Sequence, residues 1–258
     1  MLRSMKEKFL NMKFIDTHAH LNFKEFENDW KKIIKKCQEL KIGIINVGID
    51  YQTSKKAIEI AKGYKNVFSA IGLHPLSNLK EFNSQKFLNL AKNKKVVAFG
   101  EIGLDYYRAQ NKTSQIKVLL AQIKLAQKLN LPVIFHCRDA YQDLLEILKK
   151  FPKIKGVIHC FCGKIEIAKK FLKLGFYLGF NGLITYSELY QKTLSKIPVE
   201  RILLETDCPY LTPIPYKHQR NDPTYIPVIA EKISEVKKIS LKDLAKITTE
   251  NAKRLFSL

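Results

Sequence analysis

The sequence predicts an α/β protein that folds as a single (β/α)8 barrel of the TIM type. Short runs rich in Val, Ile and Phe, apolar on both faces, recur along the 258 residues, and parallel strands buried between helices and a core have this composition. Amphipathic helical patterns separate the runs, and eight strands each followed by a helix are typical of the barrel. The main alternative is an open doubly wound sheet, but the Gly-x-Gly-x-x-Gly motif that would favour it does not follow the first run.

The predicted strands are the short apolar runs themselves. They cover residues 13–17, 42–47, 67–71, 96–100, 132–136, 156–159, 176–179 and 202–205. The helical patterns between them repeat apolar residues every third or fourth position. In residues 29–40, one stripe holds Trp30, Ile33, Ile34, Cys37 and Leu40. The other patterns cover residues 114–129, 139–150, 165–174, 187–197, 223–237 and 240–255.

One domain accounts for the chain, with the barrel in residues 13–258 and an N-terminal extension in residues 1–12. No apolar run approaches the roughly 20 residues of a membrane span, and the basic N-terminus lacks the apolar centre of a secretory signal. The five cysteines are odd in number and none forms a Cys-x-x-Cys pair. That usage favours reduced thiols and a cytoplasmic location.

The net charge of +21 is large for this length. Such an excess favours contact with a polyanion such as nucleic acid. A genome rich in A and T would also inflate the lysine content, and the charge is spread along the chain instead of gathered in one tract. The charge therefore supports an acidic substrate without establishing one.

Histidines and acids gather just past the predicted strands, at the rim where a barrel carries its active site. His18 and His20 follow the first strand and, two residues apart, would point to one face. Other strands are followed by Glu101, His136, His159, Glu205 and Asp207. Imidazoles and carboxylates suit Zn²⁺, Mn²⁺ or Mg²⁺. The ligands are too many for one tetrahedral ion, so we predict two divalent metal ions with a shared carboxylate such as Glu101, an arrangement suited to hydrolysing a phosphodiester.

At these positions the sequence resembles the TatD family of metal-dependent deoxyribonucleases, over nearly the whole chain. The stretches that carry the resemblance are IDTHAHL at 15–21, AIGLHP at 70–75, GEIGLDYYR at 100–108, PVIFHCRDA at 132–140, VIHCFCG at 157–163, GFNG at 179–182, LLETDCPYL at 203–211 and RNDP at 220–223. The resemblance implies six metal ligands, which are His18, His20, Glu101, His136, His159 and Asp207. It further implies that Glu101 bridges, that His136 and His159 hold the second ion, and that the substrate is DNA, often a single strand cleaved 3′ to 5′.

Other residues are assigned to catalysis or to substrate binding, each beside a structural alternative. Asp207 is expected to accept the proton of the attacking water in addition to binding metal, and Glu205 to orient a ligand or a water. His74 and Arg138 are expected to contact substrate phosphate, unless His74 only stabilises its loop and Arg138 only pairs with an acid. Arg220 either anchors the last loop or touches a phosphate.

The resulting prediction is a divalent-metal deoxyribonuclease that acts on DNA, with single strands favoured, as a cytoplasmic monomer. Two alternatives use the same barrel: a D-aminoacyl-tRNA deacylase, because some relatives hydrolyse aminoacyl-tRNA, and a small-molecule amidohydrolase. The latter class often bridges its metals through a lysine on a barrel strand, and no lysine lies at a strand end here. A nucleic-acid-binding protein without activity is disfavoured, since binding alone does not need a complete ligand set.

Overall fold

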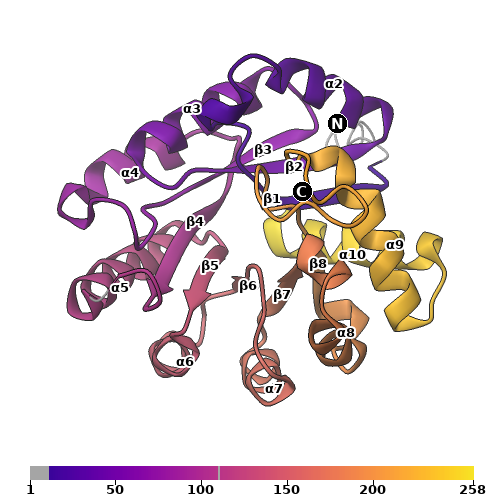
Figure 1. The fold of residues 1–258 in the computed structure, drawn as a ribbon. Coiled ribbons are helices and arrows are strands. Elements are labelled where there is room, and N and C mark those ends of the chain that lie inside the picture. The colour runs from indigo at the N-terminus through magenta and orange to yellow at the C-terminus, as the bar shows by residue number, and fades with distance from the viewer. Residues whose placement is uncertain (1–11, 110) are drawn as a thin grey trace, which may run out of the picture.

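Eight parallel strands form a nearly closed barrel surrounded by helices, as the sequence predicts (Figure 1). The computed structural model describes residues 12–109 and 111–258. The predicted N-terminal extension lies outside the described residues except for Met12, which is buried. Within these ranges no helix has the length and apolar character to cross a bilayer.

The strands pair in the order of the sequence, each with the next. They are β1 (Phe14–Ala19), β2 (Ile42–Val47), β3 (Val67–Ile71), β4 (Val96–Asp105), β5 (Val133–Arg138), β6 (Gly156–Ile158), β7 (Tyr177–Phe180) and β8 (Ile202–Leu204). A bridge between Ala19 and Cys208 links the two ends of the sheet. This seam places the end of β8 beside the end of β1.

The described helices form a ring around the strands (Figure 1). They are α2 (Trp30–Glu39), α3 (Tyr51–Lys62), α4 (Ser84–Ala91), α5 (Lys112–Leu129), α6 (Tyr141–Lys149), α7 (Ile165–Lys173), α8 (Glu188–Ser195), α9 (Ile226–Lys237) and α10 (Leu241–Phe256). The sequence patterns did not single out α3 and α4. Both begin at a clear polar cap, because the side chains of Asp50 and Asn83 accept backbone N–H groups of the first helical turn.

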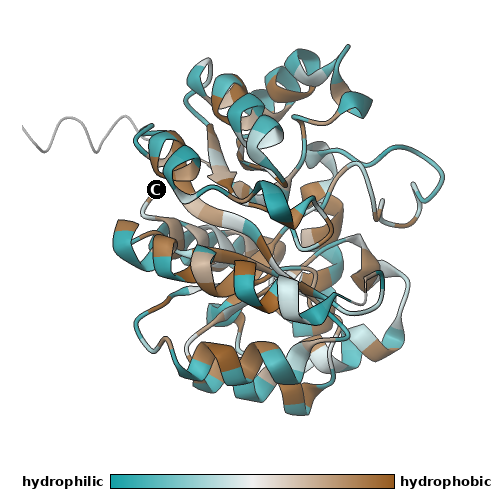
Figure 2. Ribbon diagram, turned by 90° about the vertical axis from the view of Figure 1, so that its left-hand side faces the viewer, coloured by the Kyte–Doolittle hydropathy of each residue, from teal (hydrophilic) through white to brown (hydrophobic). Residues whose placement is uncertain are grey.

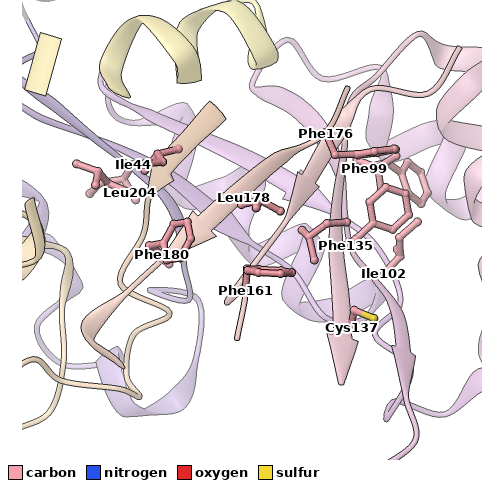
Figure 3. Packing of buried hydrophobic residues seen from close by; sticks show 14 of the residues in the cluster. Ile44, Phe99, Ile102, Phe135, Cys137, Phe161, Phe176, Leu178, Phe180 and Leu204 are labelled. Carbon is pink, nitrogen blue, oxygen red and sulfur yellow. The ribbon is translucent and has the colours of Figure 1, made fainter. Parts of the chain in front are cut away.

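Two layers of apolar side chains stabilise this arrangement. The larger layer lies between strands and helices and includes Phe99, Phe135 and Phe176 (Figure 3). The helices show alternating apolar and polar residues, as expected when one face is buried (Figure 2). The smaller layer contains one or two residues from every strand, such as Ile15, Ile134 and Leu203. Residues from all eight strands can meet in one cluster only inside a barrel. The smaller layer therefore fills the barrel interior.

Two irregularities in strand pairing turn side chains at the end of the barrel inward. The register of β1 against β2 shifts between Asp16 and Ala19, and that of β4 against β5 shifts between Phe99 and Ile102. Each shift leaves one extra residue on its strand, as a β-bulge does. The Ile15 side chain points into the barrel, so regular in–out alternation along β1 would point His18 out of the barrel. The extra residue at the bulge shifts the alternation by one position and turns His18 inward.

Candidate metal centre

The two histidines of β1 face each other inside the barrel mouth. The Nε2 atoms of His18 and His20 lie 3.0 Å apart, and both side chains are buried. The His20 Nδ1 atom lies 2.9 Å from the carbonyl oxygen of Val47. Because a carbonyl can only accept, Nδ1 carries the proton and Nε2 presents a lone pair to the interior.

Glu101 stands at the middle of the cluster, and its two carboxylate oxygens face different histidines. Oε2 lies 3.4 Å from His18 Nε2 and 3.9 Å from His20 Nε2. Oε1 lies 2.8 Å from His136 Nδ1 and 3.1 Å from His159 Nε2. One carboxylate oxygen thus faces the pair on β1 and the other faces the pair at the ends of β5 and β6, as expected of a ligand shared by two ions. The two pairs are in contact, since the His18 and His159 rings stack with their centroids 3.9 Å apart.

Asp207 completes the group on the β1 side. Its Oδ1 atom lies 3.5 Å from His20 Nε2 and 3.8 Å from His18 Nε2. The Asp207 N–H donates to the carbonyl oxygen of His18 at 2.8 Å, so the seam between β1 and β8 fixes its position. The side chain is 16% exposed, and its Oδ2 atom has no hydrogen-bond partner among the residues the structure describes. One carboxylate oxygen therefore remains available to a water or substrate.

Carboxylates behind the histidines hold the rings in place. His136 Nε2 lies 3.1 Å from Asp105 Oδ2, opposite the nitrogen that faces Glu101. His159 Nδ1 lies 3.5 Å from Glu205 Oε1. Such partners fix the tautomer and orientation of metal-binding histidines. Sequence reasoning assigned Glu205 this kind of role but missed Asp105, whose signal was its spacing of four residues from Glu101 along one strand.

Glu205 is fully buried and set in a tight frame. Its Oε1 atom accepts the Cys160 N–H at 2.6 Å and the Asn181 side-chain N–H at 3.2 Å. A Cβ at Gly179 would lie 2.3 Å from Glu205 Oε2. Glycine is therefore required at this position of the GFNG stretch, because any larger residue would displace the carboxylate.

The histidines and carboxylates shift one another's protonation. Burial alone would raise the pKa of Glu101, but the charges of His74, His159 and His18 hold it well below its ordinary value. Burial would lower the pKa of His159, and the charges of Glu101 and Glu205 raise it well above the usual value instead. Burial lowers the pKa of His18. Ionised carboxylates among partly protonated imidazoles form a cation-binding environment in which protons occupy positions that a metal ion can take.

The donor set fits divalent metal ions. His18, His20 and Glu101 offer ligand atoms within 4.8 Å of one another, and so do His18, His159 and Asp207. The Nε2 atoms of His18 and His159 both face Glu101. Among the described residues their buried Nδ1 atoms form no hydrogen bond, so the 3.5 Å approach of Glu205 to His159 Nδ1 is an ionic contact. Nitrogen and oxygen ligands of this kind are those of Zn²⁺ and Mn²⁺, and carboxylates also suit Mg²⁺.

The remaining predicted residues lie at different distances from this centre. His74 Nε2 is 3.4 Å from Glu101 Oε1, while its Nδ1 accepts the Leu76 N–H at 3.1 Å. Neutral His74 therefore carries its proton on Nε2 and faces the site as a donor. Arg138 is exposed at the end of β5. Arg220 bonds the Asp29 carboxylate and the Glu25 carbonyl and covers the Phe26 ring, which favours loop anchoring over phosphate contact.

Known proteins resemble this chain over nearly its full length. A family model described as TatD related DNase matches residues 15–257. The uncharacterized metal-dependent hydrolase YabD of Bacillus subtilis is 40% identical, over 94% of this chain and 98% of its own. The uncharacterized metal-dependent hydrolase YcfH of Escherichia coli is 33% identical, over 96% and 97%. Among solved structures, the TatD homolog YJJV of Escherichia coli superposes with a TM-score of 0.89 at 28% identity, and the match covers 95% of this chain and 98% of that one. A TatD family hydrolase of Entamoeba histolytica superposes with a TM-score of 0.89 at 30% identity, and the match covers 96% of this chain and 99% of that one.

Proposed function

The chain belongs to the TatD related DNase family, and from this premise we propose that this metal-dependent hydrolase cleaves phosphodiester bonds in DNA with the help of two divalent ions, which Glu101 and the residues around it would hold. The division of the histidines between the two oxygens of Glu101 supports this most directly. His18, His20 and Asp207 would hold one ion and His136 and His159 the other. When bound, two such ions supply an acidified water and positive charge against the phosphate.

The protein's own groups then take distinct roles. Asp207 accepts the proton of the attacking water at Oδ2, because its Oδ1 atom is the one that faces His18 and His20. Burial would raise the pKa of Asp207, but the His20 hydrogen bond and the charges of His159 and His18 lower it, so the carboxylate is ionised at neutral pH. The His74 Nε2–H donates to a phosphate oxygen placed beside Glu101. Asp105 and Glu205 keep His136 and His159 oriented.

We further propose that the enzyme acts in the cytoplasm as a monomer on single-stranded DNA. All five cysteines are free thiols, which is compatible with a reducing compartment. Every residue of the centre comes from one chain, so a second copy would not be needed to complete the site. The net charge of +21 would favour a polyanionic substrate.

A substrate panel tests the activity. Metal-stripped protein is supplied with Mg²⁺, Mn²⁺ or Zn²⁺ and given labelled single-stranded DNA, double-stranded DNA, RNA and aminoacyl-tRNA. We expect metal-dependent cleavage of DNA, fastest on the single strand. Hydrolysis of aminoacyl-tRNA with no cleavage of either DNA would replace the deoxyribonuclease by a deacylase using the same centre.

A further inference from the structure

Two exposed tyrosines stand on loops that leave the strands of the metal centre. Tyr107 is 66% exposed and lies two residues after the end of β4, and Tyr210 is 53% exposed and lies three residues after Asp207. A tyrosine combines an apolar ring with a polar hydroxyl, and such residues are enriched at binding interfaces. Because β4 and β8 are four strands apart in an eight-stranded barrel, the loops that carry the two rings leave opposite sides of its mouth.

The Tyr107 ring is held by a cation. The guanidinium carbon of Arg138 lies 4.0 Å from the ring centroid, and the Tyr106 N–H donates to the Arg138 carbonyl oxygen at 2.9 Å, which ties the two loops together. Among the described arginines only Arg220 forms an ion pair with a carboxylate. One face of the Tyr107 ring is therefore covered by a guanidinium that forms no ion pair with a carboxylate, while the side chain remains largely exposed.

Tyr210 lies on the loop that follows Asp207. Its N–H donates to the Asp207 carbonyl oxygen at 3.1 Å, and its own carbonyl oxygen accepts the Asn221 side-chain N–H at 2.5 Å. These bonds fix the backbone of Tyr210 beside Asp207, while the side chain is exposed.

We propose that Tyr107 and Tyr210 are the base-stacking residues of this enzyme, one on each side of the metal centre, with Arg138 contacting the phosphate on the Tyr107 side. An aromatic ring stacks on the face of any base, but in a duplex those faces are already occupied by neighbouring bases. The pair therefore selects an unpaired strand with at least one nucleotide on each side of the cleaved phosphate. This inference rests on the proposed function and assigns its preference for single strands to particular residues.

Binding of the metal-free full-length protein to a fluorescent oligodeoxynucleotide, measured by anisotropy in chelator, separates stacking from catalysis. Tyr107→Leu and Tyr210→Leu should each weaken binding of the unpaired strand by about 10- to 100-fold, the usual worth of a stacked base. Tyr107→Phe and Tyr210→Phe keep the ring and should bind within about threefold of the parent protein. Arg138→Gln should lower affinity and flatten its salt dependence.

Changes at the opposite end of the barrel serve as controls. Tyr64 precedes β3 and is half-buried against Trp30, and Arg254 is exposed in the last turn of α10. Tyr64→Leu and Arg254→Gln should leave oligonucleotide affinity unchanged. The annealed duplex should bind the parent protein more weakly than the single strand, and the two leucine variants should not weaken duplex binding further.

The inference is overturned if the leucine variants bind the unpaired strand like the parent, if the phenylalanine variants lose as much affinity as the leucine variants, or if the duplex binds as well as the single strand. Hydrolysis of bis(p-nitrophenyl) phosphate by the metal-loaded parent protein is scored separately. Absence of that hydrolysis would refute the proposed phosphodiesterase activity, while the anisotropy series would still decide whether the rings bind bases.

Discussion

Replacing Asp16 by Asn should change how the stability of the metal-free protein depends on pH. Asp16 is fully buried beneath His18 at the seam between β1 and β8. Its carboxylate accepts the N–H groups of His18 and Thr206 at 3.1 and 3.0 Å and the Thr206 hydroxyl at 2.6 Å. Burial outweighs these hydrogen bonds and raises the pKa of Asp16 from 3.8 to about 7.

The direction and size of the effect follow from this shift. Because the folded-state pKa lies above the unfolded value, the protonated carboxyl stabilises the fold fully below pH 3.8, and that contribution is lost as pH rises to about 7. At about 1.4 kcal/mol per pKa unit, roughly 4 kcal/mol is lost over the whole range, of which about 2 to 3 kcal/mol falls between pH 5 and pH 8. Asp16→Asn has no charge to bury and should not show this loss.

Urea unfolding of chelator-treated protein at both pH values measures the effect. The histidines of the centre titrate in both proteins, so the difference between variant and parent isolates Asp16. We expect that difference to move in favour of Asp16→Asn by about 2 to 3 kcal/mol from pH 5 to pH 8. Glu59→Gln, at an exposed position within α3, controls for replacing a carboxylate by an amide. A difference constant to within about 1 kcal/mol would refute the reasoning.

Three further predictions concern the centre and its substrate. The Asp207→Asn variant should fold and keep its metal, as measured by elemental analysis, but its turnover of DNA should fall by about 10²- to 10⁴-fold, the usual contribution of a positioned base. Loss of metal would instead mean that Asp207 acts mainly as a metal ligand. Asp105→Asn should weaken metal binding about 10- to 100-fold in a calorimetric titration, because His136 loses the carboxylate on its far nitrogen; unchanged affinity would remove Asp105 from the site. DNA affinity should fall steeply between low and physiological salt, and a flat binding constant would show that the +21 charge reflects composition and not substrate.

The fold was predictable because the buried strands and the amphipathic helices each leave a recognisable pattern in the local sequence. Seven of the predicted strands differ from the observed ones by at most two residues at either end. The exception is β4, which was expected to end at Gly100 and continues to Asp105. Its continuation, EIGLD, contains one glycine and two acidic residues in five positions, and such a composition looks like a loop when burial inside a barrel is not known.

The ligand positions could be predicted, but the reason they converge could not. Spacing indicated that His18 and His20 share a face, yet strict alternation from Ile15 or Ala98 would point His18 and Glu101 outward. The bulges that turn them inward depend on pairing with β2 and β5, which no local pattern records. Likewise, the contact of Arg220 with Asp29 joins residues far apart in sequence and leaves no signal in either segment.

The central claim is that this enzyme cleaves DNA with two divalent ions that have Glu101 as a common ligand. Stepwise return of Mn²⁺ to metal-stripped protein, with bound metal measured by elemental analysis and cleavage of labelled single-stranded DNA followed in the same samples, tests it most directly. We predict no cleavage without metal and an appearance of activity that follows occupancy of the second ion. Cleavage at the full rate by protein confirmed to be metal-free, or no cleavage by protein carrying two ions, would contradict the claim.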